Sequence, residues 1–123
     1  MTRRPVTALL LVVSLPLAGC MGTGQAPDGP AALYTALGDD DVALAAATLQ
    51  RSLESEPQGG TARWRNPASG NQGSITPRDT YVSDSGHFCR VYDEELTFAD
   101  GRSGTIVNAA CRGDSGRWVW LAG

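Results

Sequence analysis

The chain has 123 residues, of which 13 are acidic and 10 basic, so its formal net charge at pH 7 is −3. This length is enough for one small domain with a modest core and excludes two or more independently folded domains. The acidic balance gives no electrostatic basis for binding nucleic acid, so that class of partner is excluded.

The first twenty residues predict an export signal. Arg3 and Arg4 form a basic start, Val6–Leu15 supply an apolar run, and small residues precede Cys20. This order resembles the lipobox of bacterial lipoproteins, here Leu17-Ala18-Gly19-Cys20. The resemblance implies cleavage before Cys20 and acylation of that residue, so that the mature protein is anchored to a membrane. Two alternatives are an ordinary signal peptide with a coincidental cysteine and a short transmembrane helix.

Cleavage of residues 1–19 would leave 104 of the 123 residues, with eight basic and thirteen acidic side chains and a net charge of −5. Residues 20–30 then form the lipidated cysteine and a flexible tether, because Met21–Pro30 has no apolar periodicity. Residues 31–123 form the folded domain. Met21 follows the lipidated cysteine where an aspartate would favour the inner membrane, so we expect the outer membrane and its periplasmic face.

Two helices are expected at the start of the domain. A short helical turn over Ala31–Leu37 is closed by Gly38 as a left-handed cap, and the main helix follows it. Asp39 or Asp40 caps this helix, and three consecutive aspartates complement its dipole. Pro57 and the glycines after it end the helix. Helical spacing predicts its buried face: Val42, Ala45, Ala46, Leu49 and Leu53.

Beyond the helix, β-rich runs alternate with turn signals, which predicts short antiparallel strands. The fold class is therefore α+β, with one principal helix packed on a small curled antiparallel sheet of about five to six strands. The expected strands are Thr61–Asn66, Gly73–Pro77, Thr80–Ser83, His87–Phe98, Gly104–Arg112 and Arg117–Leu121.

Two cysteines remain once Cys20 is acylated. Cys89 and Cys111 should then form a disulfide, which an oxidising periplasm permits. A metal pair or a reactive thiol lacks partners, because the only histidine is His87.

The hairpin turns predict the register of the strands that follow. A three-residue loop at Ala99–Gly101 pairs Phe98 with Arg102, and the same register places Cys89 directly opposite Cys111. A four-residue loop at Gly113–Gly116 pairs Arg112 with Arg117, which lays Trp118 opposite Cys111 and Trp120 opposite Ala109. The predicted core side, packed against the helix, is Cys89, Val91, Val107, Ala109, Cys111, Trp118 and Trp120. The other face also carries apolar residues, so the sheet could curl into a partial barrel.

One series of motifs resembles a known family. Its members here are Trp64-Arg65-Asn66-Pro67, Ser69-Gly70, Gly73-Ser74-Ile75-Thr76-Pro77, Tyr81, Gly86, Cys89-Arg90-Val91-Tyr92, Gly101, Ala110-Cys111-Arg112 and Gly116-Arg117-Trp118. Together they resemble the C-terminal domain of the rickettsial seventeen-kilodalton surface antigen family of lipoproteins, from Gly38 to Trp118. The resemblance implies an outer-membrane lipoprotein of structural or interaction character without enzymatic activity. Typical members carry a glycine-zipper segment before this domain, where this chain has only Met21–Pro30.

Two short motifs overlap in the last predicted loop. Gly113-Asp114-Ser115-Gly116 looks like the nucleophile segment of chymotrypsin-like proteases, but a domain of this size cannot build their two-barrel scaffold. Arg112-Gly113-Asp114-Ser115 contains the tripeptide that integrins recognise. An ordinary hairpin loop is the favoured interpretation of both, and these four residues form the candidate interaction loop.

Other aromatic and acidic residues favour structural interpretations. Trp64 and Trp118 are expected in the core, whereas Trp120 lies near the chain end. Asp93, Glu94 and Glu95 are consecutive in a strand and point to opposite faces, which favours a solvated strand edge or a bulge over a metal or substrate site.

These features favour a lipid-anchored envelope protein with a structural or protein-interaction role. The alternatives are a periplasmic inhibitor of a host hydrolase such as lysozyme, which an acidic domain suits, and an envelope hydrolase. No catalytic residue, metal or cofactor is expected apart from the acyl chains on Cys20. The expected partners are the membrane, through those chains, and other envelope proteins.

Overall fold

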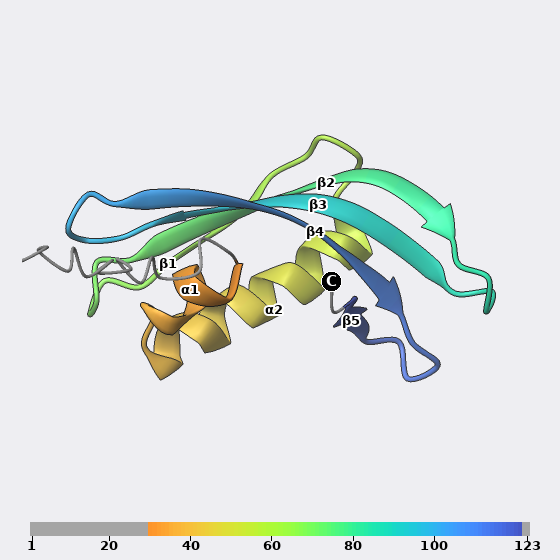
Figure 1. The fold of residues 1–123 in the computed structure, drawn as a ribbon, viewed down its shortest axis with the longest axis horizontal. Coiled ribbons are helices and arrows are strands. Elements are labelled where there is room, and N and C mark those ends of the chain that lie inside the picture. Colours follow the sequence, from red (N-terminus) through yellow and green to blue (C-terminus); the bar gives the residue numbers. More distant parts are fainter. Residues whose placement is uncertain (1–29, 122–123) are drawn as a thin grey trace, which may run out of the picture.

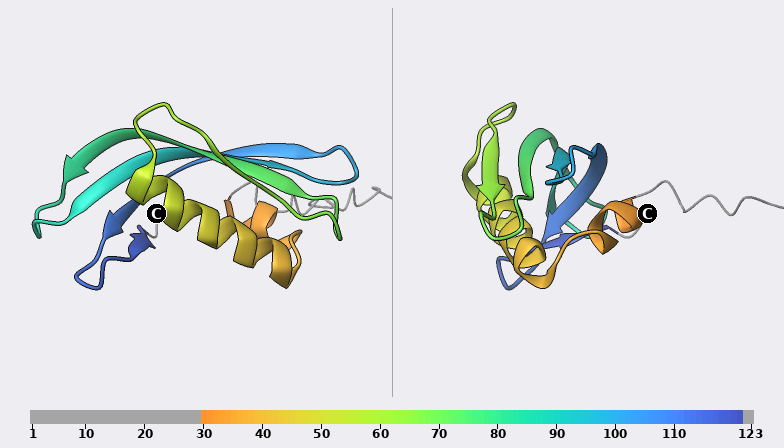
Figure 2. Two further views of the ribbon diagram at one scale, coloured as in Figure 1. Left: turned by 180° about the vertical axis from the view of Figure 1, so that it is seen from behind. Right: turned by 90° about the vertical axis from the view of Figure 1, so that its left-hand side faces the viewer.

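The computed structural model describes residues 30–121, which form two helices and one antiparallel sheet. The sheet has five strands in the order β1-β2-β3-β4-β5, so each strand pairs with its neighbours in the chain. It curls around one long helix, which lies along its inner face (Figures 1 and 2). The predicted α+β class, with one principal helix on a curled sheet, is confirmed. The expected signal segment, Cys20 and the tether as far as residue 29 lie outside the described residues, as do residues 122 and 123. Pro30, expected as the last residue of the tether, is the first residue of α1.

The helices are α1 (Pro30–Thr35) and α2 (Asp39–Ser55). As predicted, α2 ends just before Pro57, because proline cannot continue a helix. The cap at its start differs from the prediction. Gly38 is the N-cap, in an extended conformation with φ −77° rather than a left-handed one, and its amide donates to the Asp41 carboxylate over 3.1 Å. The backbone N–H of the residue just before the helix is thus hydrogen-bonded to a side chain inside the helix. Asp39 and Asp40, the predicted caps, are instead the first two residues of the helix.

The strands follow the expected boundaries closely, with one merger. The two strands predicted at 73–77 and 80–83 form a single strand, β2, with a register shift between Pro77 and Thr80. A shift of this kind lets a strand continue past residues that do not pair with the neighbouring strand. The strands are β1 (Ala62–Arg65), β2 (Gln72–Val82), β3 (Phe88–Thr97), β4 (Ser103–Arg112) and β5 (Trp118–Trp120).

The β3–β4 hairpin has the register that its turn predicts. The Phe98 amide donates to the Arg102 carbonyl over 2.8 Å across the loop. At the other end of the hairpin, Cys89 pairs with Cys111, and the two form the predicted disulfide with a Cα–Cα distance of 3.9 Å. The turn chemistry thus positions two cysteines that are 22 residues apart in sequence.

The core lies on the opposite face of the sheet from the one predicted. The disulfide is on the outer face, where Val107 is 68% exposed, whereas Tyr92 and Leu96 face α2 and are fully buried. The inner face carries the larger apolar side chains. Burying it against α2 therefore removes more apolar surface from water than burying the other face would. The predicted core members Cys89 and Trp118 are buried, but Trp120 is 46% exposed. The buried hydrophobic residues are Ala45, Leu49, Leu53, Ala62, Trp64, Ile75, Cys89, Tyr92, Leu96, Phe98, Ile106, Ala110 and Trp118.

The buried face of α2 is rotated slightly from the predicted one. Ala45, Leu49 and Leu53 are buried as expected, but Val42 is 38% exposed and Ala46 is also exposed. Because the sheet curls around the helix, it covers positions that apolar spacing alone does not mark. The additional buried positions on α2 are Asp41, Thr48 and Ser52.

Helix α1 packs against the sheet near the start of β4. Leu33 lies directly over Gly104, where an added Cβ would come within 2.7 Å of the leucine side chain. This glycine therefore allows α1 to approach the sheet closely. Tyr34, one residue further along, packs against the ring of Trp120 at a centroid distance of 5.3 Å.

Candidate interaction site

The loop between β4 and β5 contains three of the candidate interaction residues and follows the fourth, Arg112, which ends β4. It is one residue longer than predicted. The Gly113 amide donates to the Arg117 carbonyl over 2.8 Å, and Gly116 has a φ of 82°, which glycine adopts without strain. Arg112 consequently pairs with Trp118, and the predicted pairing of Arg112 with Arg117 is wrong.

This shift of one position reverses the faces of β5. Val119, not Trp118, lies opposite Cys111, and Trp120 pairs with Ala110 instead of Ala109. Trp118 therefore turns toward α2, where it is 7% exposed, and the prediction that it belongs to the core is confirmed by this different route. Trp64 is also in the core, at 5% exposed.

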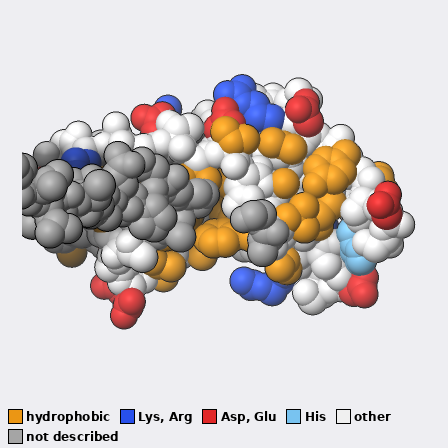
Figure 3. All heavy atoms as spheres, viewed as in Figure 1, with side chains coloured by type: hydrophobic (Ala, Val, Ile, Leu, Met, Phe, Trp, Pro, Cys, Tyr) orange, Lys and Arg blue, Asp and Glu red, His pale blue; other side chains and the backbone are white. Residues whose placement is uncertain are grey.

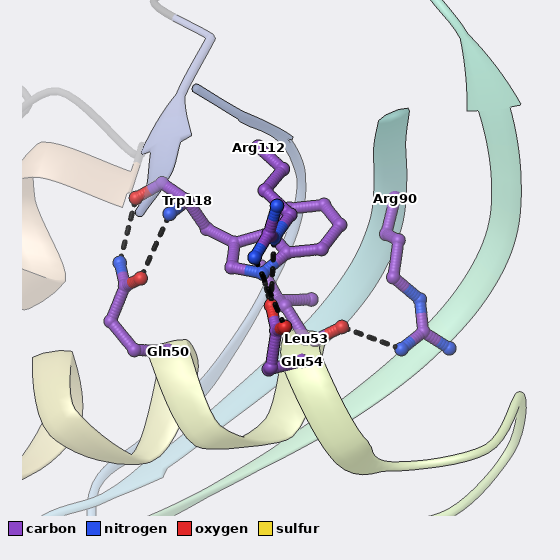
Figure 4. Close-up of polar contacts among 6 residues, drawn as sticks. All are labelled: Gln50, Leu53, Glu54, Arg90, Arg112 and Trp118. Carbon is purple, nitrogen blue, oxygen red and sulfur yellow. Dashed lines mark hydrogen bonds and ion pairs between the residues drawn. The ribbon is translucent and has the colours of Figure 1, made fainter. Parts of the chain in front are cut away.

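The base of the loop is attached to α2 through Glu54. The Arg112 guanidinium donates to the Glu54 carboxylate over 3.1 Å, and the Trp118 indole N–H donates to the same oxygen over 2.9 Å (Figure 4). The hydrogen bond from Trp118, followed by that from Arg112, lowers the pKa of Glu54. One carboxylate on the helix thus holds the residues on both sides of the loop.

Gln50 attaches the short strand β5 to the same helix. Its side-chain amide accepts from the Trp118 backbone N–H over 2.8 Å and donates to the Trp118 carbonyl over 2.6 Å (Figure 4). The glutamine thereby takes the place that a neighbouring strand would have. A three-residue strand at the edge of the sheet is held by this contact and by its pairing with β4.

Arg90, on β3, closes the C-terminal end of α2. Arg90 is 9% exposed, and its guanidinium donates to the Leu53 carbonyl over 2.9 Å (Figure 4). It also donates to the Glu56 carbonyl over 2.8 Å. These carbonyls have no partners inside the helix, and a cation stabilises the negative end of the helix dipole. Sequence reasoning missed this role. The only signal is that Arg90 falls in the same alternation as Tyr92 and Leu96, which marks the inner face.

The tip of the loop is open to solvent. The Asp114 side chain is fully exposed, and its carboxylate lies 3.1 Å from Nε2 of His87, the residue just before β3. Nδ1 of the same histidine lies 3.0 Å from the Ser85 hydroxyl. Of the candidate residues, Arg112 is thus engaged at the base by Glu54, whereas Asp114 is presented at the tip.

This arrangement gives the protease-like tetrapeptide a structural interpretation. The histidine contacts Asp114 rather than Ser115, so the serine of the tetrapeptide is not paired with a base. In a catalytic triad the carboxylate is buried and orients the histidine, whereas Asp114 is fully exposed. The tetrapeptide forms a hairpin loop, as favoured above.

The three consecutive acidic residues of β3 are divided between the two faces, as alternation requires. Glu94 is 1% exposed on the inner face and accepts a hydrogen bond from the Tyr34 hydroxyl. Burial raises the pKa of Glu94, and the hydrogen bond from Tyr34 opposes this effect. Asp93 lies on the outer face, 2.6 Å from Arg78. The expected solvated edge or bulge is wrong, because β3 pairs on both sides and its register is unbroken here.

A second buried carboxylate, Asp41, connects the start of α2 to the β1–β2 turn. Burial alone would raise the pKa of this group, but four hydrogen bonds outweigh burial and lower the pKa to about 2. Three come from turn side chains, at donor–acceptor distances of 2.6 to 2.8 Å: Asn66, Ser69 and Asn71. The fourth comes from Gly38. Asp41 lies three residues after the N-cap, and this position was the sequence signal for its role.

Two further features concern the candidate sites. Within residues 30–121, no group of three or more His, Cys, Asp or Glu side chains could hold a metal ion. Neither helix in that range is long and apolar enough to cross a bilayer. The disulfide residues Cys89 and Cys111 are joined, whereas the predicted lipidation site Cys20 precedes the described part of the chain.

Comparison with known proteins places this fold in a family. A family model described as the 17 kDa outer membrane surface antigen matches residues 51–119, which include β1 to β4 and all but the last residue of β5. The chain belongs to this family. The resemblance inferred from the sequence motifs is thereby confirmed.

Curated members of the family share about two fifths of the aligned residues. The 17 kDa surface antigen of Rickettsia bellii strain RML369-C is 38% identical over 80 residues, and that of Rickettsia prowazekii strain Madrid E is 40% identical over 80 residues. The antigen of Rickettsia rickettsii is 39% identical over the same length. In each case the alignment covers 65% of this chain and 50% of the relative. The chain thus spans about half the length of the curated relatives it matches, and no solved structure matches it.

Proposed function

We propose that this protein is an outer-membrane lipoprotein, anchored through acyl chains on Cys20, that contacts other envelope proteins through the Arg112–Ser115 loop. Membership of the surface antigen family supports an outer-membrane or surface location. The lipobox-like residues before Cys20 support the anchor. The protein's role is structural or interactive, without catalysis, and its relatives are named as surface antigens.

One observation carries the interaction role, the contrast between the base and the tip of the loop. The disulfide, Glu54 and Gln50 fix the base, whereas the Asp114 side chain at the tip is fully exposed. A rigid base lowers the entropy lost when a partner binds the tip. An exposed carboxylate on a fixed support suits a basic or hydrogen-bond-donating protein surface.

Substitution of Cys20 tests the anchor. Cells expressing the wild-type chain, Cys20→Ala or the matched control Met21→Ala would be labelled with a fatty-acid analogue and fractionated. We expect label and outer-membrane recovery for the wild type and Met21→Ala, and neither for Cys20→Ala. Equal labelling of all three chains would overturn the anchor.

Site-specific photocrosslinking tests the interaction role. A crosslinking residue would replace Asp114 at the tip of the β4–β5 loop or Asp100, a partly exposed aspartate in the β3–β4 turn, as the control. We expect discrete envelope-protein adducts from position 114 in intact cells and none of the same mass from position 100. The same adducts from both positions, or none from either, would contradict a role for this loop.

A further inference from the structure

Exposed hydrophobic side chains lie on β2 to β5, and the face drawn in Figure 3 shows several of them over β4 and β5. Val107 is 68% exposed and Val119 61%, while Trp120 and Leu121 are 46% and 45% exposed. Tyr34 of α1 is half-buried and packs against Trp120. We call these five residues the apolar edge. Monomeric soluble domains rarely expose several large apolar side chains side by side unless something binds them.

Strand register explains why these residues form one surface. Val119 pairs with Cys111, and the Leu121 amide donates to the Ala109 carbonyl, so both side chains share the outer face with Val107. Leu121 lies diagonally across from Val107, and Val119 lies further along β5. Trp120 points to the inner face, where its ring meets Tyr34 edge to face, with an angle of 64° between the planes. Both faces of β5 are therefore apolar, and α1 extends the surface.

The position of the apolar edge relative to the anchor identifies its occupant. Helix α1 begins at Pro30, ten residues after Cys20, and carries Tyr34 in its last turn. Ten residues reach at most about 35 Å when extended, and a flexible chain of that length spans roughly 18 Å on average. In a domain anchored at Cys20, the start of α1 therefore stays within about 35 Å of the bilayer.

The chemistry of the edge suits a lipid surface better than another strand. Gln50 already occupies the backbone N–H and carbonyl of Trp118, so at this position β5 cannot add a strand from a second copy. Tryptophan and tyrosine prefer the boundary between acyl chains and headgroups, since their rings are apolar and their N–H and O–H groups are polar. Arg117, exposed in the loop just before β5, can donate to lipid phosphate groups.

We propose that the apolar edge lies on the bilayer to which the protein is anchored, with Trp120 and Leu121 inserted at the headgroup level. The proposal rests on the lipid anchor of the proposed function. Bilayer contact would orient the domain, with β4 and β5 toward the membrane, and limit the directions from which a partner can reach the β4–β5 loop.

Tryptophan fluorescence in vesicles tests this orientation. Trp64 and Trp118 are 5% and 7% exposed, so lipid-borne quenchers report mainly on Trp120. The acylated full chain would be reconstituted into phosphatidylethanolamine and phosphatidylcholine vesicles whose acyl chains are brominated near the headgroup. We expect quenching that Trp120→Phe abolishes, and that Leu121→Asp reduces several-fold. The matched control Leu44→Asp, at a 38% exposed position of α2, should leave the quenching unchanged.

Flotation of the same vesicles separates the two proposals, and thermal melts would confirm that each variant is folded. Protein that floats with the vesicles but shows no quenching keeps its anchor and overturns the bilayer contact. Protein that does not float has no anchor, which overturns both. Equal effects of Leu121→Asp and Leu44→Asp would also overturn the contact, as would crosslinking of Trp120 to a second copy of the chain.

Discussion

The two ends of α2 are attached to the sheet by buried groups of opposite charge. At the N-terminal end, the Asp41 carboxylate accepts four hydrogen bonds, and at the C-terminal end the Arg90 guanidinium donates to two helix carbonyls. Each charge stabilises the end of the helix dipole that it faces. The direction of the helix thus decides which sign of charge this small core buries at each end.

The middle of the sheet provides a contrast with both ends. Glu94 is as deeply buried as Asp41, yet it accepts one hydrogen bond, from Tyr34, and lies away from a helix N-terminus. The pKa of Asp41 is lowered and that of Glu94 is raised. Two buried carboxylates in one domain thus differ because of the number of donors that face them.

Removing the N-terminal attachment should have the largest effect. Asp41→Ala leaves three turn donors and the Gly38 amide unpaired, so we expect a loss of about 4 kcal/mol in the free energy of unfolding. Urea denaturation would measure it. Asp40→Ala, which removes an exposed neighbour, should change stability little. Similar losses in the two variants would contradict the role assigned to Asp41.

The same attachment predicts the acid stability of the domain. Because the pKa of Asp41 is lowered from 3.8 to about 2, its contribution is present above pH 4 and is lost as the pH falls toward 2. We expect about 2 kcal/mol to disappear over this interval. Asp41→Asn should lack this part of the pH dependence when unfolding is followed by circular dichroism between those values.

Breaking the disulfide should rank second. Cys89 and Cys111 directly precede Arg90 and Arg112, so the disulfide fixes on the outer face the strands that hold the C-terminal half of α2 on the inner face. We expect Cys89→Ser with Cys111→Ser to lower the free energy of unfolding by about 3 kcal/mol. Thermal melts with and without a reductant would measure it. The double variant should be insensitive to reductant, and a wild-type midpoint unaffected by reduction would contradict the expectation.

Removing the attachment at the C-terminal end of α2 should destabilise the domain less than Asp41→Ala or loss of the disulfide. Arg90→Met keeps the aliphatic bulk but leaves the carbonyls of Leu53 and Glu56 without their donor, so we expect a loss of about 2 kcal/mol. Hydrogen exchange should show faster opening of the last turn of α2. Arg117→Met, at an exposed arginine, is the matched control. Unchanged exchange in Arg90→Met would show that this end of the helix is held by packing alone.

Neutralising Glu94 should have the smallest effect and the opposite sign. Burial raises its pKa, so the folded state binds a proton more tightly than the unfolded state, and stability declines as the pH rises above about 4.5. Glu94→Gln should remove this decline and raise stability at neutral pH by about 1 kcal/mol. Chemical denaturation at pH 4 and pH 7 would measure the difference. A variant less stable than the wild type at pH 7 would show that the ionised group is needed.

Features fixed by neighbouring residues could be predicted from the sequence. The Ala99–Gly101 turn and the alternation of β3 and β4 predicted the Cys89–Cys111 pairing, because a short turn determines which residues lie opposite each other. Pro57 predicted the end of α2 for the equally local reason that proline has no N–H to donate.

The tertiary structure alone decided which face of the sheet became the core. Both faces carry apolar residues, and only their total burial against α2 favours Tyr92 and Leu96 over Val91 and Val107. The candidate loop also combines a local and a tertiary feature. Its glycines predicted a turn, but they did not predict the register of β5, in which Trp118 contacts Gln50 and Glu54. Turns and strand alternation are local properties, whereas burial and the pairing of distant polar groups depend on segments that meet only when the chain folds.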